Sequence, residues 1–108
     1  METIERAYAA LKNLGLTKSQ YDFSRDWLGR CESYMSANKA RGTEPSVQSL
    51  LFLDFRLQSM RKALASALNS HYAQEGARQL GEVREAVWLR VRQRSIRQEG
   101  QAGAVPKN

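Results

Sequence analysis

The stretch Thr17–Leu57 decides the fold of this 108-residue chain, and it reads TKSQYDFSRDWLGRCESYMSANKARGTEPSVQSLLFLDFRL. Gly29 separates two short segments whose apolar residues recur at helical spacing, and glycine is common just past the end of a helix. Pro45 then separates the second segment from a longer and more apolar run. The sequence therefore predicts a short helix, a turn, a second short helix, a loop and a longer helix.

Polar residues mark where these helices should begin. Thr17 and Gln20 form a T-x-x-Q capping box, in which each side chain satisfies an otherwise unpaired amide at the start of a helix. The helix that follows should run to about Leu28. Ser33 or a neighbour should start the second short helix, and Ser46 should cap the longer one.

Residues 17–57 resemble the lambda-repressor and Cro-like helix-turn-helix superfamily. The matching positions are Ser19-Gln20, Phe23, Leu28-Gly29, Ser33-Tyr34-Met35-Ser36, Arg41-Gly42 and Pro45-Ser46. The chain departs from that pattern twice. The run from Gln20 to Gly29 is one residue longer, so Trp27-Leu28 replaces a single apolar position, and Asn38 stands where a second apolar residue is expected. The resemblance implies a DNA-binding domain in which Gln20 contacts a phosphate or a base; the alternative for Gln20 is a cap alone.

The second short helix is the one expected to read DNA. Tyr34 and Met35 should face the core, while the outward residues are small or polar. Small outward side chains let a helix approach base edges closely, and Ser, Asn and Lys can hydrogen-bond to them. The residues predicted to contact DNA are Gln20, Arg30, Ser33, Ser36, Ala37, Asn38, Lys39 and Arg41. Trp27 should be a core residue and not a stacking platform.

Helical spacing also predicts helices on either side of this stretch. A first helix ends near Gly15, and its apolar stripe is Ile4, Ala7, Tyr8, Leu11 and Leu14. The longer helix continues as a heptad-like seam of Leu50, Leu53, Leu57, Met60, Leu64 and Ala67. A fifth helix, over roughly residues 77–97, carries Ala77, Leu80, Val83, Val87 and Val91. The sequence leaves open whether this helix continues from the fourth or folds back after Gly76.

The chain should be all-α, with a helix-turn-helix four-helix N-terminal core over residues 1–58. Residues 59–97 should form a C-terminal helical extension that serves dimerisation. Residues 98–108 should be a disordered tail, because they have little to bury.

Apolar side chains outside the seam predict a homodimer. Leu51, Phe52 and Phe55 make the first turns of the longer helix apolar on almost every side, which is more surface than one small domain can cover. The predicted dimer interface is Leu51, Phe52, Phe55, Met60, Leu64, Val87 and Trp88. A dimer would place two reading helices in successive major grooves, about 34 Å apart.

The charge of the chain favours a polyanionic partner. It has 17 Lys and Arg against 11 Asp and Glu, a net charge of +6. Residues 1–50 contain seven bases and six acids, whereas residues 51–108 contain ten and five, so most of the excess lies in the second half. Possible phosphate contacts are Lys18, Arg25, Arg90, Arg92 and Arg94. The alternative is that these bases are only solvated, or that they meet an acidic protein.

Composition excludes several classes of protein. The 42% hydrophobic content excludes a wholly disordered chain. No run approaches the roughly 18 apolar residues of a membrane span, and the start METIERAYAA lacks a secretory signal, so a cytoplasmic location is expected. Cys31 and His71 are the single cysteine and histidine, which excludes an internal disulfide and a zinc cluster. No catalytic motif is present, so neither enzyme activity nor a cofactor is expected.

These observations predict a sequence-specific transcriptional regulator, for instance a repressor, that occupies a pseudo-palindromic site on double-stranded DNA as a homodimer. The rival prediction is a helical protein-binding adaptor or anti-activator without DNA binding, which would hold a protein through its apolar helical surface. The two differ at the second short helix, because a reader needs Ser36, Asn38 and Lys39 to be free and an adaptor does not.

Overall fold

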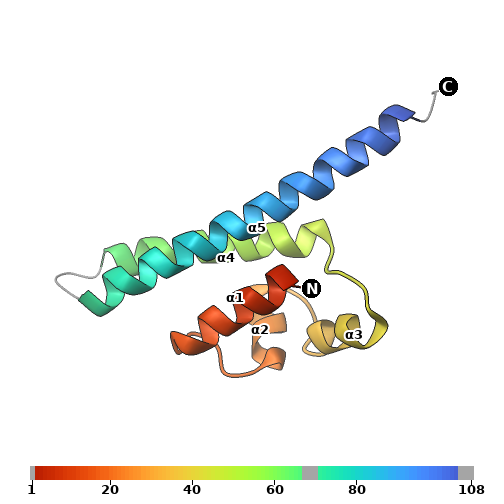
Figure 1. Cartoon of the computed structure of the whole chain (residues 1–108). Helices are drawn as coiled ribbons and strands as arrows, with labels where there is room; N and C mark the ends of the chain where they lie inside the picture. Colours follow the sequence, from red (N-terminus) through yellow and green to blue (C-terminus); the bar gives the residue numbers. More distant parts are fainter. Residues whose placement is uncertain (1, 67–70, 105–108) are drawn as a thin grey trace.

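The computed structural model describes residues 2–66 and 71–104 of the chain, with side chains described as far as residue 96. This part of the chain is all-α (Figure 1). Its helices are α1 (Glu2–Asn13), α2 (Gln20–Trp27), α3 (Tyr34–Arg41), α4 (Val47–Ala65) and α5 (His71–Ala104). The order of elements predicted for residues 17–57 is therefore confirmed as α2, α3 and α4.

The fifth helix folds back against the fourth, which decides the alternative that the sequence leaves open. In Figure 1, α4 and α5 lie side by side as an antiparallel pair. Arg84 of α5 pairs with Asp54 at 2.8 Å, and further along α5 Arg90 pairs with Glu44, ahead of α4. α5 begins six residues earlier than the predicted start at residue 77 and extends past the start of α4.

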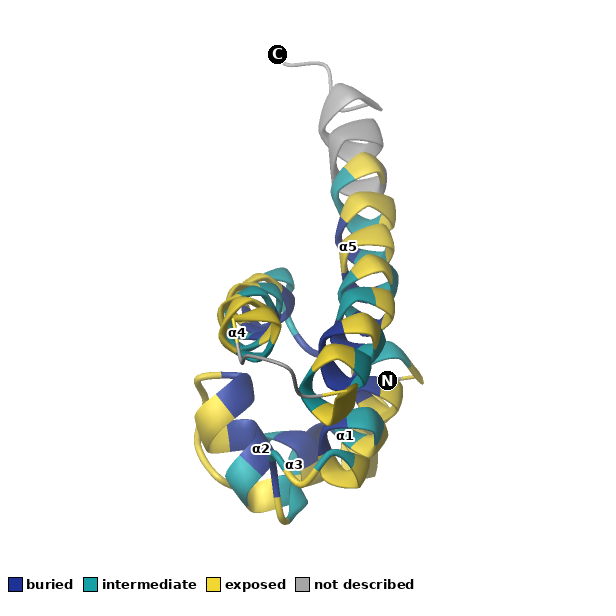
Figure 2. Cartoon of the chain, turned by 90° about the vertical axis from the view of Figure 1, so that its left-hand side faces the viewer, coloured by how far each residue is buried: buried dark blue, intermediate teal, exposed yellow. Residues whose placement is uncertain are grey.

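One apolar core joins all five helices. Ile4 of α1, Phe23 of α2, Met35 of α3, Leu53 of α4 and Val87 of α5 are each at most 1% exposed. They belong to one cluster, which also contains Leu11, Trp27, Leu28, Leu50, Leu57, Leu80, Val83 and Val91. Figure 2 shows these buried positions on the faces that the helices turn toward one another. The predicted boundary between residues 58 and 59 falls inside α4, so it separates no two packing units.

The seam of α4 packs into the core of its own chain. Leu50, Leu53 and Leu57 are buried, and Met60 and Leu64 are partly buried against the same core. Val87, predicted at a dimer interface, is fully buried. Val87 is therefore closed to a second copy, whereas Met60 and Leu64 keep part of their surface exposed and their place at a dimer interface stays a prediction. Ala67, the last predicted residue of the seam, lies outside the described residues.

The C-terminal segment is more helical than predicted. α5 continues to Ala104, so residues 98–104, predicted as disordered tail, belong to a helix. Between Pro45 and Pro106 the sequence carries no proline, the residue that most strongly ends a helix. The remaining predicted tail residues, 105–108, lie outside the described residues.

Candidate nucleic-acid interface

The start of α2 is capped differently from the prediction. Ser19 is the cap, and its hydroxyl accepts a hydrogen bond from the Asp22 amide at 3.2 Å. The Thr17 hydroxyl is buried without a hydrogen-bond partner among the described residues. The predicted Thr17–Gln20 capping box is therefore wrong, because the helix begins two residues later than that box requires. Gln20 is the first residue of α2 and is half-buried.

The turn between α2 and α3 needs glycine at position 29. Gly29 has φ +65°, in the left-handed region, where residues with a Cβ are disfavoured. A Cβ there would also lie 3.0 Å from the Phe52 ring of α4. Arg56, one turn later, donates to the Asp26 carbonyl at 2.9 Å and lies over the Trp27 ring. Trp27 is 2% exposed, which confirms its predicted place in the core.

An unpaired backbone amide at the start of α3 finds its hydrogen-bond partner in a serine of the neighbouring helix. Ser33 precedes α3 but makes no side-chain capping bond. Instead the hydroxyl of buried Ser24, on α2, accepts from the Met35 amide at 3.1 Å. The first amides of a helix lack partners within the helix, so this bond both caps α3 and fixes it to α2. Sequence reasoning missed Ser24 because its partner lies eleven residues away.

Arg30 braces the turn against α4. Its guanidinium donates to the Ser49 and Ser46 hydroxyls, each at 2.9 Å, and lies over the Tyr34 ring at 5.3 Å. The Tyr34 hydroxyl accepts from the Ser46 amide at 3.0 Å and from the Ser49 hydroxyl at 3.1 Å. Burial would raise the pKa of Tyr34, but these hydrogen bonds and the Arg30 charge hold that pKa below its ordinary value. Arg30, predicted as a DNA contact, is thus engaged within the protein.

The end of α3 buries a residue that was predicted to face DNA. Asn38 is 5% exposed. Its amide donates to the Tyr34 carbonyl at 2.8 Å, and its oxygen accepts from the Thr43 hydroxyl at 2.8 Å. The outward prediction for Asn38 is wrong, because residues three and four apart share a helix face and Asn38 follows buried Met35. Gly42 closes the helix with a left-handed φ of +67°.

The outer face of α3 carries small and basic side chains. Ser36 is exposed and donates to the Ser33 carbonyl, while Lys39 is exposed and 3.7 Å from the Glu5 carboxylate of α1. Ala37 is half-buried. The other exposed residues on and beside the helix are Ser33, Ala40 and Arg41. The sequence of α3, YMSANKAR, contains no acid, so this face suits a polyanion.

Arg25, a predicted phosphate contact, lies in an acidic setting. It pairs with Asp26 at 2.9 Å, Asp22 at 3.0 Å and Glu32 at 3.2 Å. The Asp26 carboxylate holds the pKa of Arg25 above its ordinary value, and Arg25 holds the pKa of Asp26 below its own. Because three carboxylates surround one guanidinium, this spot repels a phosphate.

The predicted phosphate contacts on α5 are mostly engaged with the loop before α4. Arg90 pairs with Glu44 and lowers the pKa of that carboxyl, and Arg94 donates to the Pro45 carbonyl. Arg92 is exposed on the same helix, and Lys18 is exposed ahead of α2. Lys39 and Arg41 are the basic side chains of α3 itself, and Lys18 stands ahead of α2.

The described residues also limit which metal sites and membrane-spanning segments this part of the chain can form. No group of three or more His, Cys, Asp and Glu residues in that part of the chain could hold a metal ion. Cys31 is exposed near the start of α3, and His71 is exposed at the start of α5. Within the described part of the chain, no helix is long and apolar enough to cross a membrane.

Comparisons place the chain in a family without assigning an activity. Neither the curated proteins nor the solved structures contain a match to it. The model of one family, described as a family of unknown function (DUF6626), matches residues 4–100. This match covers α1 to α4 and most of α5, and the chain therefore belongs to the DUF6626 family.

Proposed function

We propose that this chain binds double-stranded DNA in a sequence-specific manner, with α2 and α3 as a helix-turn-helix and α3 as the reading helix. The observation that carries the proposal is the contrast between the two sides of α3. On its inner side, the Met35 amide donates to Ser24 of α2 and the Tyr34 hydroxyl accepts from the Ser46 amide, whereas the helix itself contains no acid and its outer side is rich in short side chains. A rigid helix with a small outer surface suits the major groove.

The residues assigned to DNA differ in part from those the sequence predicts. Ser33, Ser36, Lys39 and Arg41 are exposed on or beside α3 and are proposed to meet base edges and phosphates. Ala37 is proposed to allow the close approach, and Gln20 and Lys18 to contact the backbone from the start of α2. Arg30 becomes a positioning residue, because its donors point at Ser46 and Ser49. Lys39 would exchange its long contact with Glu5 for a phosphate or a base.

Selection from a random duplex library, followed by binding to the enriched sequence at several salt concentrations, tests the proposal. Ser36→Glu with Lys39→Glu places two carboxylates against the groove. Each lost base contact is worth roughly 1–3 kcal/mol, so the double variant should bind the selected duplex at least about tenfold more weakly. Its circular dichroism should match that of the wild type, because both side chains are exposed.

A control variant lowers the net charge by four, against three for the α3 variant, without touching α3. Arg6→Glu with Lys12→Glu reverses two exposed bases of α1. It should keep most of the preference for the selected duplex and lose only the nonspecific part of binding. A folded Ser36→Glu, Lys39→Glu variant that binds as tightly as the wild type would contradict the proposed reading helix, and failure to enrich any sequence would contradict sequence-specific binding.

The homodimer and the transcriptional role stay predictions. Of the predicted interface, Leu51, Phe52, Phe55 and Trp88 keep exposed surface of 39–61%. Phe52 also packs beside Gly29, so its ring is partly committed to the turn. Of the remaining three side chains, Trp88 lines a groove between α4 and α5, and the chemistry of that surface favours another occupant over a second copy.

A further inference from the structure

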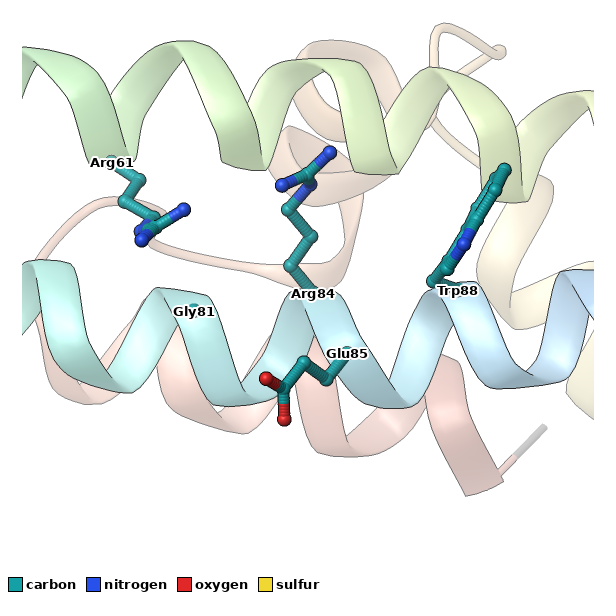
Figure 3. Close-up of a pocket in the computed structure, with 5 residues that line it drawn as sticks. All are labelled: Arg61, Gly81, Arg84, Glu85 and Trp88. Carbon is teal, nitrogen blue, oxygen red and sulfur yellow. The ribbon is translucent and has the colours of Figure 1, made fainter.

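A groove of about 320 Å³ runs between α4 and α5 on the side that faces away from α1 and α2 (Figure 3). It is lined by Arg61, Gly81, Arg84, Glu85 and Trp88. Figure 3 shows Arg61, Arg84 and Trp88 directed into the space between the two helices, with Glu85 directed away from it. Gly81 lies against Arg61, since a Cβ at this position would meet the Arg61 side chain in ordinary contact at 3.5 Å.

Exposed apolar side chains stand at one end of this groove. Trp88 is 49% exposed and lines it, and Phe55 and Leu51 on α4 are 61% and 43% exposed. Arg84 pairs with Asp54 across the two helices, which places Trp88, one turn further along α5, level with Leu51, one turn earlier on α4. Phe55 lies one turn after Leu51 on the outer side of α4. These three side chains form an apolar cluster that no described element covers.

Unpaired cations lie on both sides of the apolar cluster. Among the described residues, Arg61, Lys62 and Arg92 form no ion pair. Arg61 and Lys62 follow Phe55 by two turns on α4, and Arg92 follows Trp88 by one turn on α5. Arg84 is neutralised by Asp54, and Glu85 is the one acid among the five residues that line the groove. The surface is thus apolar in the middle and basic at both ends.

We propose that this surface, defined by Leu51, Phe55, Trp88, Arg61, Lys62 and Arg92, binds an acidic amphipathic helix of another protein. Such a helix offers apolar side chains on one face and carboxylates beside them. It would cover the apolar cluster and neutralise the cations at both ends. This activity goes beyond DNA binding by α3 and uses a different part of the molecule.

Charge complementarity selects this occupant over two others. In a dimer through this surface, two identical surfaces would face each other. Each has three cations against Glu85, so they would repel. Duplex DNA would neutralise the cations, but its phosphates are charged. They would offer the Phe55 and Trp88 rings no apolar surface to pack against. An acidic helix alone satisfies both kinds of side chain.

The spacing of the cations sets the length of the partner. Arg61 lies beside Gly81, and Arg92 is eleven residues further along α5. At 1.5 Å per residue this is about 16 Å, or about three turns of a partner helix. The partner should therefore carry acids near both ends of a three-turn apolar stripe.

A synthetic helical peptide with Leu and Phe at i, i+3, i+4 and i+7 and Glu elsewhere is the probe. Emission of Trp88 should shift to the blue on binding, because that ring is half-exposed, whereas Trp27 is already buried. Trp88→Phe should remove the shift while the anisotropy of a labelled peptide still reports binding. A scrambled peptide of equal charge should bind about tenfold more weakly or worse, because it lacks a continuous apolar face.

Charge reversal provides the sharper test. Arg61→Glu with Lys62→Glu should weaken binding of the acidic peptide about tenfold or more and should create binding of the same peptide with Lys in place of Glu. Arg6→Glu with Lys12→Glu is the matched control and should leave peptide binding within about twofold, since its charges lie on α1, from which the groove faces away. Circular dichroism and thermal melting establish that each variant is folded.

Three results would overturn the proposal. The first is equal binding of the acidic, scrambled and charge-swapped peptides. The second is a dimer in light scattering that Phe55→Glu converts to a monomer, which would assign the surface to a second copy. The third is a blue shift of Trp88 with vesicles of phosphatidylcholine and phosphatidylglycerol but not with the peptide, which would assign it to lipid. None of these results affects binding of the selected duplex by α3, so the two proposals fail separately.

Discussion

The α2–α3 unit and the α4–α5 pair are held together by different forces. Around α3, polar side chains provide the fixed contacts: Ser24 caps it, Arg30 ties the turn to α4, and Asn38 closes its end. The α4–α5 pair is joined chiefly by a stripe of Leu and Val, including Leu53 and Val87. Hydrogen bonds have directional geometry and apolar burial has little, so the first unit should be precise in orientation and the second should supply most of the stability.

The largest effect should come from opening the α4–α5 core. Leu53 is fully buried, so Leu53→Ala should lower the free energy of unfolding by about 2–5 kcal/mol. Leu51→Ala is the matched control, because Leu51 is 43% exposed on the same helix and should cost less than about 1 kcal/mol. Chemical denaturation measures both, and equal losses would show that the α4–α5 pair is not the main source of stability.

The next effect concerns the turn that joins α2 to α3. Gly29→Ala forces an L-residue into a left-handed conformation, at about 1–2 kcal/mol, and presses its Cβ on the Phe52 ring. Gly15→Ala has a similar φ of +75° but open space around its Cβ, so thermal melting should show the smaller loss for it. Adding Phe52→Ala should remove the difference between the two glycine variants. A difference that survives this change would contradict the account of Gly29.

Removing the cap of α3 should cost a similar amount. Ser24→Ala leaves the Met35 amide buried without its partner, which costs about 1–3 kcal/mol. Ser33→Ala should change the free energy of unfolding by no more than about 0.5 kcal/mol, because Ser33 makes no capping bond. Hydrogen exchange of the Met35 amide reports the same contact directly. Slow exchange of that amide in Ser24→Ala would mean that another group caps α3.

The smallest effect is a pH dependence at the exposed pair of Glu44 and Arg90. Arg90 holds the pKa of Glu44 below its ordinary value of 4.5. A depressed folded pKa adds stability above the unfolded pKa, and that stability is lost as pH falls through the folded pKa. Arg90→Gln should therefore lower stability slightly at pH 7 and leave it unchanged once Glu44 is protonated in both states. Identical stability curves from pH 2 to 7 would mean that this pair is only a solvated contact.

The order of the helices could be predicted from local signals, and the tertiary contacts could not. Gly29 and Gly42 end α2 and α3, and Ser46 caps α4, because the required backbone geometry is specified within a few residues. The capping prediction failed at Thr17 because Ser19 offers a competing hydroxyl two residues later. The neighbouring residues alone do not show which of the two hydroxyls will cap the helix.

The functional residues were predicted less well, because burial depends on contacts distant in sequence. Arg30 appears as a free base in the sequence, yet its hydroxyl partners lie 16 and 19 residues later. Arg90 and Arg94 likewise contact the loop before α4 across more than 40 residues. Asn38 was a local error, since helical spacing from Met35 already places it inward. The heptad seam of α4 was recognised, but its packing partner within the chain, α5, was not.

The most direct test of the DNA-reading account is a titration of the isotope-labelled chain with the selected duplex, followed by backbone amide NMR. The account predicts that the largest changes in amide chemical shift fall on Ser33, Ser36, Lys39 and Arg41. Smaller changes should occur at Gln20 and almost none at Phe55 and Trp88. Raising the salt concentration should reduce all of these changes together. Changes confined to the α4–α5 surface, with the α3 amides unmoved at saturating duplex, would contradict it.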